Sequence, residues 1–126
     1  MMKKAMSLLF VGLFGLCGCS AAQYESISMS EGLNRMAKED NYLLIDVRRA
    51  DEYAAGHIPG ALNIPNESIG SQAIAALPDK EQTIYLYCRS GNRSKQAAAK
   101  LAKQGYTKLL EIGGIGDYPG ELEYGN

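Results

Sequence analysis

Residues 83–94 read TIYLYCRSGNRS, an apolar run that ends on Cys88 and a polar loop that follows it. The run is typical of a strand buried on both faces of a sheet. The loop carries Arg89, Gly91 and Arg93, and a helical pattern begins directly behind it. Such a loop can turn its backbone N–H groups towards a negative charge on or near the sulfur. The stretch therefore predicts a strand, a reactive cysteine and a helix, in that order.

Strands and helices alternate on both sides of this stretch. Apolar runs predict strands at 42–47, 61–64, 83–87 and 109–112. Helical spacing and end signals predict helices at 29–38, 71–77 and 94–104 and a turn with a short helix within 48–55; residues 23–27 are either a tether or a first edge strand. This alternation predicts an α/β fold, with a central, mostly parallel sheet flanked by helices on both faces. Sites in such folds form at the carboxyl ends of strands, where Cys88 would lie.

The first 20 residues have the pattern of an export signal. Lys3 and Lys4 precede an uncharged apolar run over 5–16, which is too short to span a bilayer but suits the core of a signal peptide. Residues 16–19, LCGC, resemble a bacterial lipobox, which implies cleavage before Cys19 and lipidation of that cysteine. The alternatives are ordinary cleavage after residues 20–22, SAA, and a retained N-terminal helix buried in the fold.

The lipobox interpretation divides the chain into a signal peptide at 1–18, a lipidated Cys19 with a tether at 19–27, and a folded domain at 28–126. It predicts an exported protein of the periplasm or cell surface, anchored to a bacterial membrane by the N-terminal lipid alone. Cys17 would leave with the leader, so Cys88 would be the only free thiol in a compartment that favours disulfides. The alternative is a buried, inert cysteine at the end of a core strand.

The loop chemistry favours a thiolate. A free cysteine has a pKa of about 8.5, and the loop amides, the positive N-terminal end of the following helix and the two arginines should all lower the pKa of Cys88. Gly91 allows a backbone conformation that a Cβ would disfavour. The hydroxyls of Ser90 and Ser94 add further donors.

Four separate segments, in order, resemble a single-domain rhodanese of the small exported kind. They are LIDVR at 44–48, EYAAGHIPGALNIP at 52–65, IYLYCRSGNRS at 84–94 and GGI at 113–115. The resemblance implies a sulfurtransferase in which Cys88 takes sulfane sulfur from a donor such as thiosulfate. Cys88 would hold that sulfur as a persulfide and pass it to cyanide, a small thiol or a partner protein thiol. It implies substrate-binding residues at Arg89, Ser90, Gly91, Asn92, Arg93 and Ser94, and no cofactor besides the persulfide. We expect a monomer.

Two rivals remain open. Cysteine phosphatases of the same fold use a loop one residue longer, whereas four residues separate Cys88 from Arg93 here, so the cradle should fit a single sulfur atom better. Tyr87 also stands where many of those phosphatases carry histidine. The second rival is a non-catalytic rhodanese module that binds a partner or senses redox state.

The remaining polar residues favour structural roles. His57 is the only histidine and is expected to hold backbone groups in its loop. Asp46 is expected to cap a turn after its strand, and Arg48 to pair with Glu52. One histidine without a cysteine cluster argues against a metal site, and a net charge of -1 gives no reason to expect nucleic acid. Tyr118 replaces a tryptophan common in the resembled family, so the last helix is expected to be short or absent.

Overall fold

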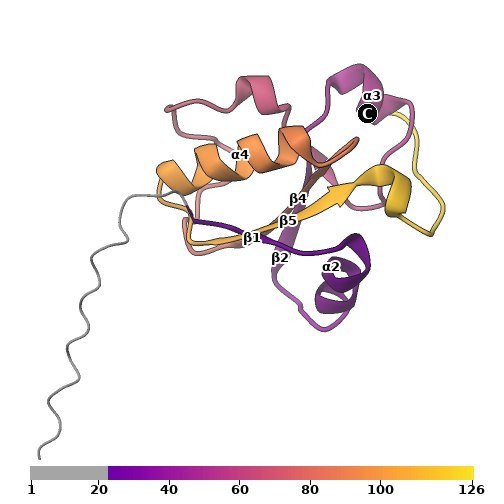
Figure 1. The fold of residues 1–126 in the computed structure, drawn as a ribbon. Coiled ribbons are helices and arrows are strands. Elements are labelled where there is room, and N and C mark those ends of the chain that lie inside the picture. Colours follow the sequence, from indigo (N-terminus) through magenta and orange to yellow (C-terminus); the bar gives the residue numbers. More distant parts are fainter. Residues whose placement is uncertain (1–22) are drawn as a thin grey trace, which may run out of the picture.

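The fold is a five-stranded parallel sheet in the computed structural model, which describes residues 23–126 (Figure 1). The strands lie in the order β1-β5-β4-β2-β3, and each neighbouring pair is parallel. Their bounds are Glu25–Ser26 (β1), Tyr42–Asp46 (β2), Leu62–Asn63 (β3), Thr83–Cys88 (β4) and Lys108–Gly114 (β5). The predicted α/β fold is therefore confirmed, and β4, which carries the cysteine, is the central strand.

Helices cover both faces of this sheet. They are α2 (Met29–Met36), α3 (Ala50–Ala54) and α4 (Asn92–Lys103), with 3-10 turns η3 (Asn66–Ser68) and η4 (Ile115–Asp117). Helix α4 lies on one face and α2 on the other (Figure 1), and Tyr53 of α3 packs against the core on the α2 side. No helix within residues 23–126 is long and apolar enough to cross a membrane.

Alternation along β4 divides its side chains between two cores. Ile84, Leu86 and Cys88 point to the α4 face, and Tyr85 and Tyr87 point to the α2 face. All five are fully buried. Burying a side chain of leucine or isoleucine size contributes roughly 1.5–3 kcal/mol, so these two layers hold the strand firmly. Cys88 is thus directed towards the start of α4.

Helix α4 begins two residues earlier than predicted. Gly91, with φ 103°, turns the chain into the helix, and Lys95 donates its backbone N–H to Gly91 O at 3.1 Å. Positive φ of this size is accessible to glycine but strained for other residues. The apolar face, Ala97, Ala98 and Leu101, packs on the sheet as expected.

The helix predicted at 71–77 is wrong. This segment forms bends and a turn, and a 3-10 turn at Asn66–Ser68 takes its place in the connection to β4. Ile69 and Leu77 are buried at its two ends and fix the path of the chain. Among residues 71–77 only Leu77 is buried, so the segment has no apolar helical face to hold a helix against the core.

Both ends of the described chain add to the sheet region. Of the two alternatives for residues 23–27, the structure shows the edge strand, because β1 pairs with Leu110 and Glu111 of β5. At the other end, the expected shortening of the last helix is confirmed by η4, a single turn. The tail beyond it runs back to α3, where His57 and Glu123 exchange backbone hydrogen bonds at 2.8 Å (Figure 1).

Candidate active site

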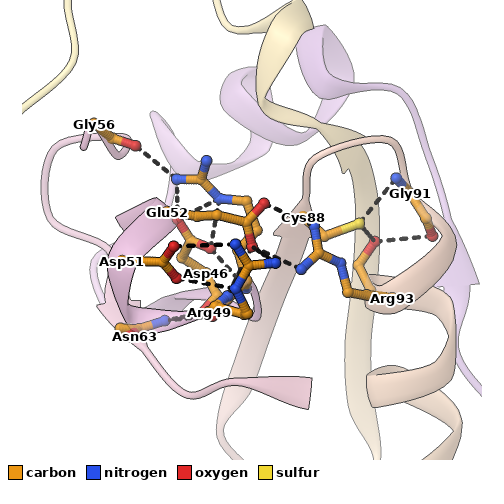
Figure 2. A network of polar contacts seen from close by, with 11 residues as sticks. Asp46, Arg49, Asp51, Glu52, Gly56, Asn63, Cys88, Gly91 and Arg93 are labelled. Atoms are coloured by element: carbon orange, nitrogen blue, oxygen red, sulfur yellow. Dashed lines mark hydrogen bonds and ion pairs between the residues drawn. The ribbon is translucent and has the colours of Figure 1, made fainter. Parts of the chain in front are cut away.

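The candidate site is built on the last residue of β4. Cys88 has no exposed surface, and its Sγ accepts the Gly91 N–H at 2.9 Å (Figure 2). The Ser94 Oγ lies 3.5 Å from the same sulfur. The loop therefore directs donors at the sulfur from Ser90, Gly91 and Ser94, whereas the role of residues 89–94 in binding a substrate stays a prediction.

Two glycines allow the loop to close this tightly. Gly91 has the positive φ described above, which brings its N–H to the sulfur. Gly114 pairs with Cys88 across a register shift between β4 and β5. A Cβ at Gly114 would lie 2.3 Å from the Arg89 carbonyl oxygen, so only glycine fits beneath the loop. Gly113 and Gly114 thus lie directly beneath the loop that surrounds Cys88.

The surroundings of Cys88 lower the pKa of its thiol. Burial opposes the thiolate, but a side-chain hydrogen bond from Ser94 and backbone hydrogen bonds from Ser94, Gly91 and Ser90 outweigh it. The predicted direction of the shift is confirmed. Its main causes are hydrogen bonds within the loop, and the arginines are not among the leading ones.

Arg93 is engaged in an ion pair that the sequence did not reveal. Its guanidinium donates to both carboxylate oxygens of Glu52, at 2.8 and 3.2 Å (Figure 2). Glu52 also accepts the Arg49 N–H at 3.0 Å. The hydrogen bond from Arg93 holds the pKa of the Glu52 carboxyl down, at about 2. The positive charge of Arg93 is therefore largely balanced before any substrate arrives.

The predicted pair between Arg48 and Glu52 is wrong. Arg48 instead binds Asp46, with Nη2 2.7 Å from Oδ2, and donates to Gly56 O at 2.6 Å. Arg48 precedes α3 and so does not share a helix face with Glu52. The expected turn cap is confirmed, because Asp46 Oδ1 accepts the Arg48 N–H at 2.9 Å.

The other predicted loop residues lie at the rim. Arg89, Ser90 and Asn92 are exposed, whereas Gly91 and Ser94 are buried. Within residues 23–126, none of the ion pairs involves Arg89. Arg89 is thus the arginine of the loop that remains able to meet an anion.

His57 takes the structural position expected of it. Its Nδ1 lies 2.8 Å from Tyr53 O, and its ring stacks on the Tyr53 ring with centroids 3.7 Å apart. Tyr87, on the sheet face opposite to Cys88, accepts the Ile58 N–H at 3.0 Å. Both residues hold the loop after α3 in place. No group of three or more candidate metal ligands occurs within residues 23–126.

One buried residue of the site was not predicted. Glu111 of β5 is 2% exposed, and its Oε2 lies 2.6 Å from the Ser94 Oγ. The signal for it was present in the sequence, since a glutamate interrupts the apolar run of β5 two residues before Gly113. The predicted lipidation site, Cys19, and the signal peptide lie outside the described residues.

The structure is an α/β domain with a buried cysteine at the carboxyl end of its central parallel strand, next to a loop and a helix N-terminus. A family model described as a rhodanese-like domain matches residues 29–118. The chain therefore belongs to the rhodanese-like sulfurtransferase family, and the prediction of a rhodanese-type enzyme is confirmed.

Relatives of known name support this assignment. The chain is 40% identical over 73 residues to thiosulfate sulfurtransferase PspE of Escherichia coli, which covers 58% of this chain and 70% of that protein. It is 40% identical over 94 residues to a sulfurtransferase of Allochromatium vinosum, which covers 74% of this chain and 83% of the relative. A solved structure, described as a rhodanese with anions from E. coli, is similar with a TM-score of 0.61 and 36% identity, covering 67% of this chain and 99% of that one.

Proposed function

We propose that this protein moves sulfane sulfur from an anionic donor such as thiosulfate to a thiophilic acceptor, with Cys88 as the carrier. The observation that carries the proposal is the Gly91 N–H donated to Cys88 Sγ at 2.9 Å inside a loop that lowers the pKa of the thiol. The names of the relatives from E. coli and A. vinosum support the same reaction class.

The reaction runs in two displacements at sulfur. The Cys88 thiolate attacks the outer sulfur of thiosulfate, the sulfur–sulfur bond of the donor breaks, and sulfite leaves with the electron pair. The terminal sulfur of the resulting persulfide carries the negative charge, which the loop N–H groups stabilise. Cyanide or a thiolate then attacks that terminal sulfur, and Cys88 leaves as a thiolate. No external oxidant or reductant is needed.

Arg89 is the residue that would attract the anionic sulfur donor. Arg93 is paired with Glu52, whereas Arg89 is exposed at the rim of the loop. Arg89→Gln should therefore raise KM for thiosulfate several-fold at low salt and less at high salt, because exposed charges are screened. Lys103→Gln, at the far end of α4, is the matched control for loss of one positive charge. An unchanged KM in Arg89→Gln would remove this role.

Persulfide formation can be measured directly. Purified protein is incubated with thiosulfate and weighed by mass spectrometry. The wild type should gain one sulfur atom, Cys88→Ser should gain none, and a wild type that gains nothing would contradict the proposal.

The non-catalytic module is the second candidate, and the complete burial of Cys88 is the observation that favours it. Alkylation by iodoacetamide distinguishes the enzyme from the non-catalytic module, because a cysteine that carries sulfur must be accessible to small reagents. Slow alkylation of folded protein at neutral pH, as slow as that of an inert buried thiol, would support the module over the enzyme.

We also propose export and lipid anchoring through Cys19. The support is the leader sequence, with its lysines, its apolar run and the lipobox-like residues 16–19. Acyl labelling in the native host should be lost in Cys19→Ala and retained in Cys17→Ala. Label that persists in Cys19→Ala would refute the assignment.

A further inference from the structure

A carboxylate lies buried directly beside the cysteine loop. Glu111 is 2% exposed, and its Oε2 accepts the Gly113 N–H at 2.7 Å and faces the Ser94 Oγ at 2.6 Å. Its Oε1 accepts from Ser26 Oγ at 2.8 Å and lies 3.8 Å from Lys95 Nζ. Buried charged groups are costly unless they are hydrogen-bonded in this way. The sulfur-transfer steps above make no use of this group.

Ser94 connects this carboxylate to the reactive sulfur. Its Oγ lies within hydrogen-bonding reach of three acceptors: Glu111 Oε2 at 2.6 Å, Gly91 O at 3.0 Å and Cys88 Sγ at 3.5 Å. A serine hydroxyl has one proton to donate. The ionised oxygen is both the closest acceptor and the strongest type, so it competes with the sulfur for that proton.

We propose that Glu111 is a positioning residue that restrains the reactivity of Cys88 through the Ser94 hydroxyl. When the carboxylate holds the Ser94 proton, the sulfur faces a lone pair of the hydroxyl oxygen, which suits a thiol better than a thiolate. When Cys88 ionises, the same proton must turn from Glu111 towards the sulfur. Glu111 thus opposes the thiolate and, by the same contact, the charged persulfide.

The other charged groups near Cys88, Ser94 and Glu111 do not compete for the Ser94 hydroxyl proton. Lys95 of α4 lies beside Glu111 on the exposed side. Arg93 of α4 and Glu52 of α3 form their own ion pair. A Cβ placed on Gly91 would be 3.6 Å from both Glu111 Oε2 and Lys95 Nζ, so these two head groups border the loop itself. Replacing Glu111 by glutamine removes the negative charge that competes for the hydroxyl proton.

The test is the pH profile of Cys88 alkylation by iodoacetamide. A neutral amide oxygen is a weaker acceptor than a carboxylate, so Glu111→Gln should release the Ser94 proton to the sulfur. The midpoint of the profile should fall by about one pH unit. Glu81→Gln, an exposed glutamate before β4, is the matched control and should leave the midpoint unchanged. A midpoint that stays or rises in Glu111→Gln would overturn the proposal, a rise indicating that Glu111 only supports the shape of the loop.

Ser94→Ala shows whether the effect passes through the hydroxyl. In that background the shift caused by Glu111→Gln should shrink to less than half, since only the through-space charge remains. A full shift without the hydroxyl would overturn the role of Ser94. If Glu111→Gln does not fold, Glu111→Asp withdraws the carboxylate by one methylene and should shift the midpoint in the same direction; no shift would count against the proposal.

The inference rests on Cys88 being the nucleophile of the proposed function, but alkylation needs no sulfur donor. If Glu111→Gln does not shift the alkylation midpoint, the proposed sulfur transfer is unaffected. If the wild type gains no sulfur from thiosulfate, the link between Glu111 and Cys88 is still decided by the alkylation profile.

Discussion

Glu52 receives hydrogen bonds from two different helix starts. The Arg93 guanidinium binds it from α4, and the Arg49 N–H binds it from the N-cap of α3. Its side chain is 19% exposed, so the ion pair is only partly screened by water. The pair joins α3 to the cysteine loop, which gives one carboxylate a role in both stability and the shape of the site mouth.

The stability that Glu52 contributes should depend on pH. Its pKa is about 2 in the folded protein, against an ordinary value of 4.5. Its contribution is therefore fully present above pH 4.5 and is lost as the pH falls towards 2. Glu52→Gln should lower the free energy of unfolding by about 2 kcal/mol at pH 7, and this difference from the wild type should shrink towards zero near pH 2.

Urea unfolding at pH 7, 4 and 2.5 would show this trend. Glu121→Gln, on the exposed tail, is the control and should match the wild type throughout. A difference between Glu52→Gln and wild type that is the same at all three values would argue against the ion pair as its source.

Prediction from sequence succeeded for residues whose roles follow from local chemistry. Cys88, Gly91 and Ser94 were expected in the cradle because a thiol, a turn-forming glycine and a helix start follow one another along the chain. Partners set by tertiary contact were missed. Glu52 was assigned to Arg48 four residues earlier, but its partner Arg93 comes from an element 41 positions away. Glu111 reaches the site only because β5 lies next to β4.

At the scale of elements, the junction of β4, the loop and α4 depends on how closely β5 approaches. Gly114 lies under Arg89, where a Cβ would be 2.3 Å from the Arg89 carbonyl oxygen and 2.9 Å from its carbon. Backbone atoms cannot move aside as a flexible side chain can. The loop and the end of β5 therefore form one rigid unit.

Gly114→Ala should damage both the fold and the cradle. We expect a loss of about 2 kcal/mol or more in the free energy of unfolding, as is usual for overpacking, together with slower persulfide formation. Gly116→Ala, two residues later, meets no atom within 4 Å and should behave like the wild type. Urea unfolding and mass spectrometry measure the two effects. A Gly114→Ala variant as stable and as active as Gly116→Ala would show that the loop is not held by this contact.

The elements that sequence predicted well are those with a strong period and clear ends. Helix α4 has an apolar stripe and ends before Gly105, and β4 and β2 are continuous apolar runs. The segment 71–77 contains alanines, which favour helix, but it forms bends and a turn. The buried side chains that fix its path are Ile69, just before it, and Leu77, its last residue. Local propensity favoured a helix there, and the packing of those two side chains decided otherwise.

At the scale of the whole molecule, the tail closes the fold where a longer final helix is missing. Backbone hydrogen bonds of 2.8 Å join Glu123 to His57 in both directions and Gly125 N–H to Ala54 O. Leu122 packs over Gly56, where an added Cβ would be 3.0 Å from its Cδ1. The tail is thus an integral part of the α3 side of the domain.

Deletion of residues 121–126 should lower the free energy of unfolding by about 3 kcal/mol, since it removes three backbone hydrogen bonds and the Leu122 contact. Persulfide formation below the unfolding transition should persist, because the tail contributes no donor to Cys88. Urea unfolding and mass spectrometry of the shortened chain test both parts. Loss of sulfur uptake in a folded, shortened chain would instead place the tail in the site.

The short strand β1 has a consequence for how the domain would face its surroundings. All five strands run the same way, and Glu25 lies level with Tyr85, three residues before Cys88, so the chain enters β1 from the amino-terminal side of the sheet and Cys88 lies towards the carboxyl ends of the strands. Only six residue steps separate Glu25 from Cys19, which gives a leash of at most about 20 Å if Cys19 carries the proposed lipid. A tether of this length favours an orientation in which the amino ends of the strands face the membrane and the Cys88 end of the domain faces away from it. The enzyme would then serve solutes in the aqueous space beyond the membrane in preference to groups embedded in it.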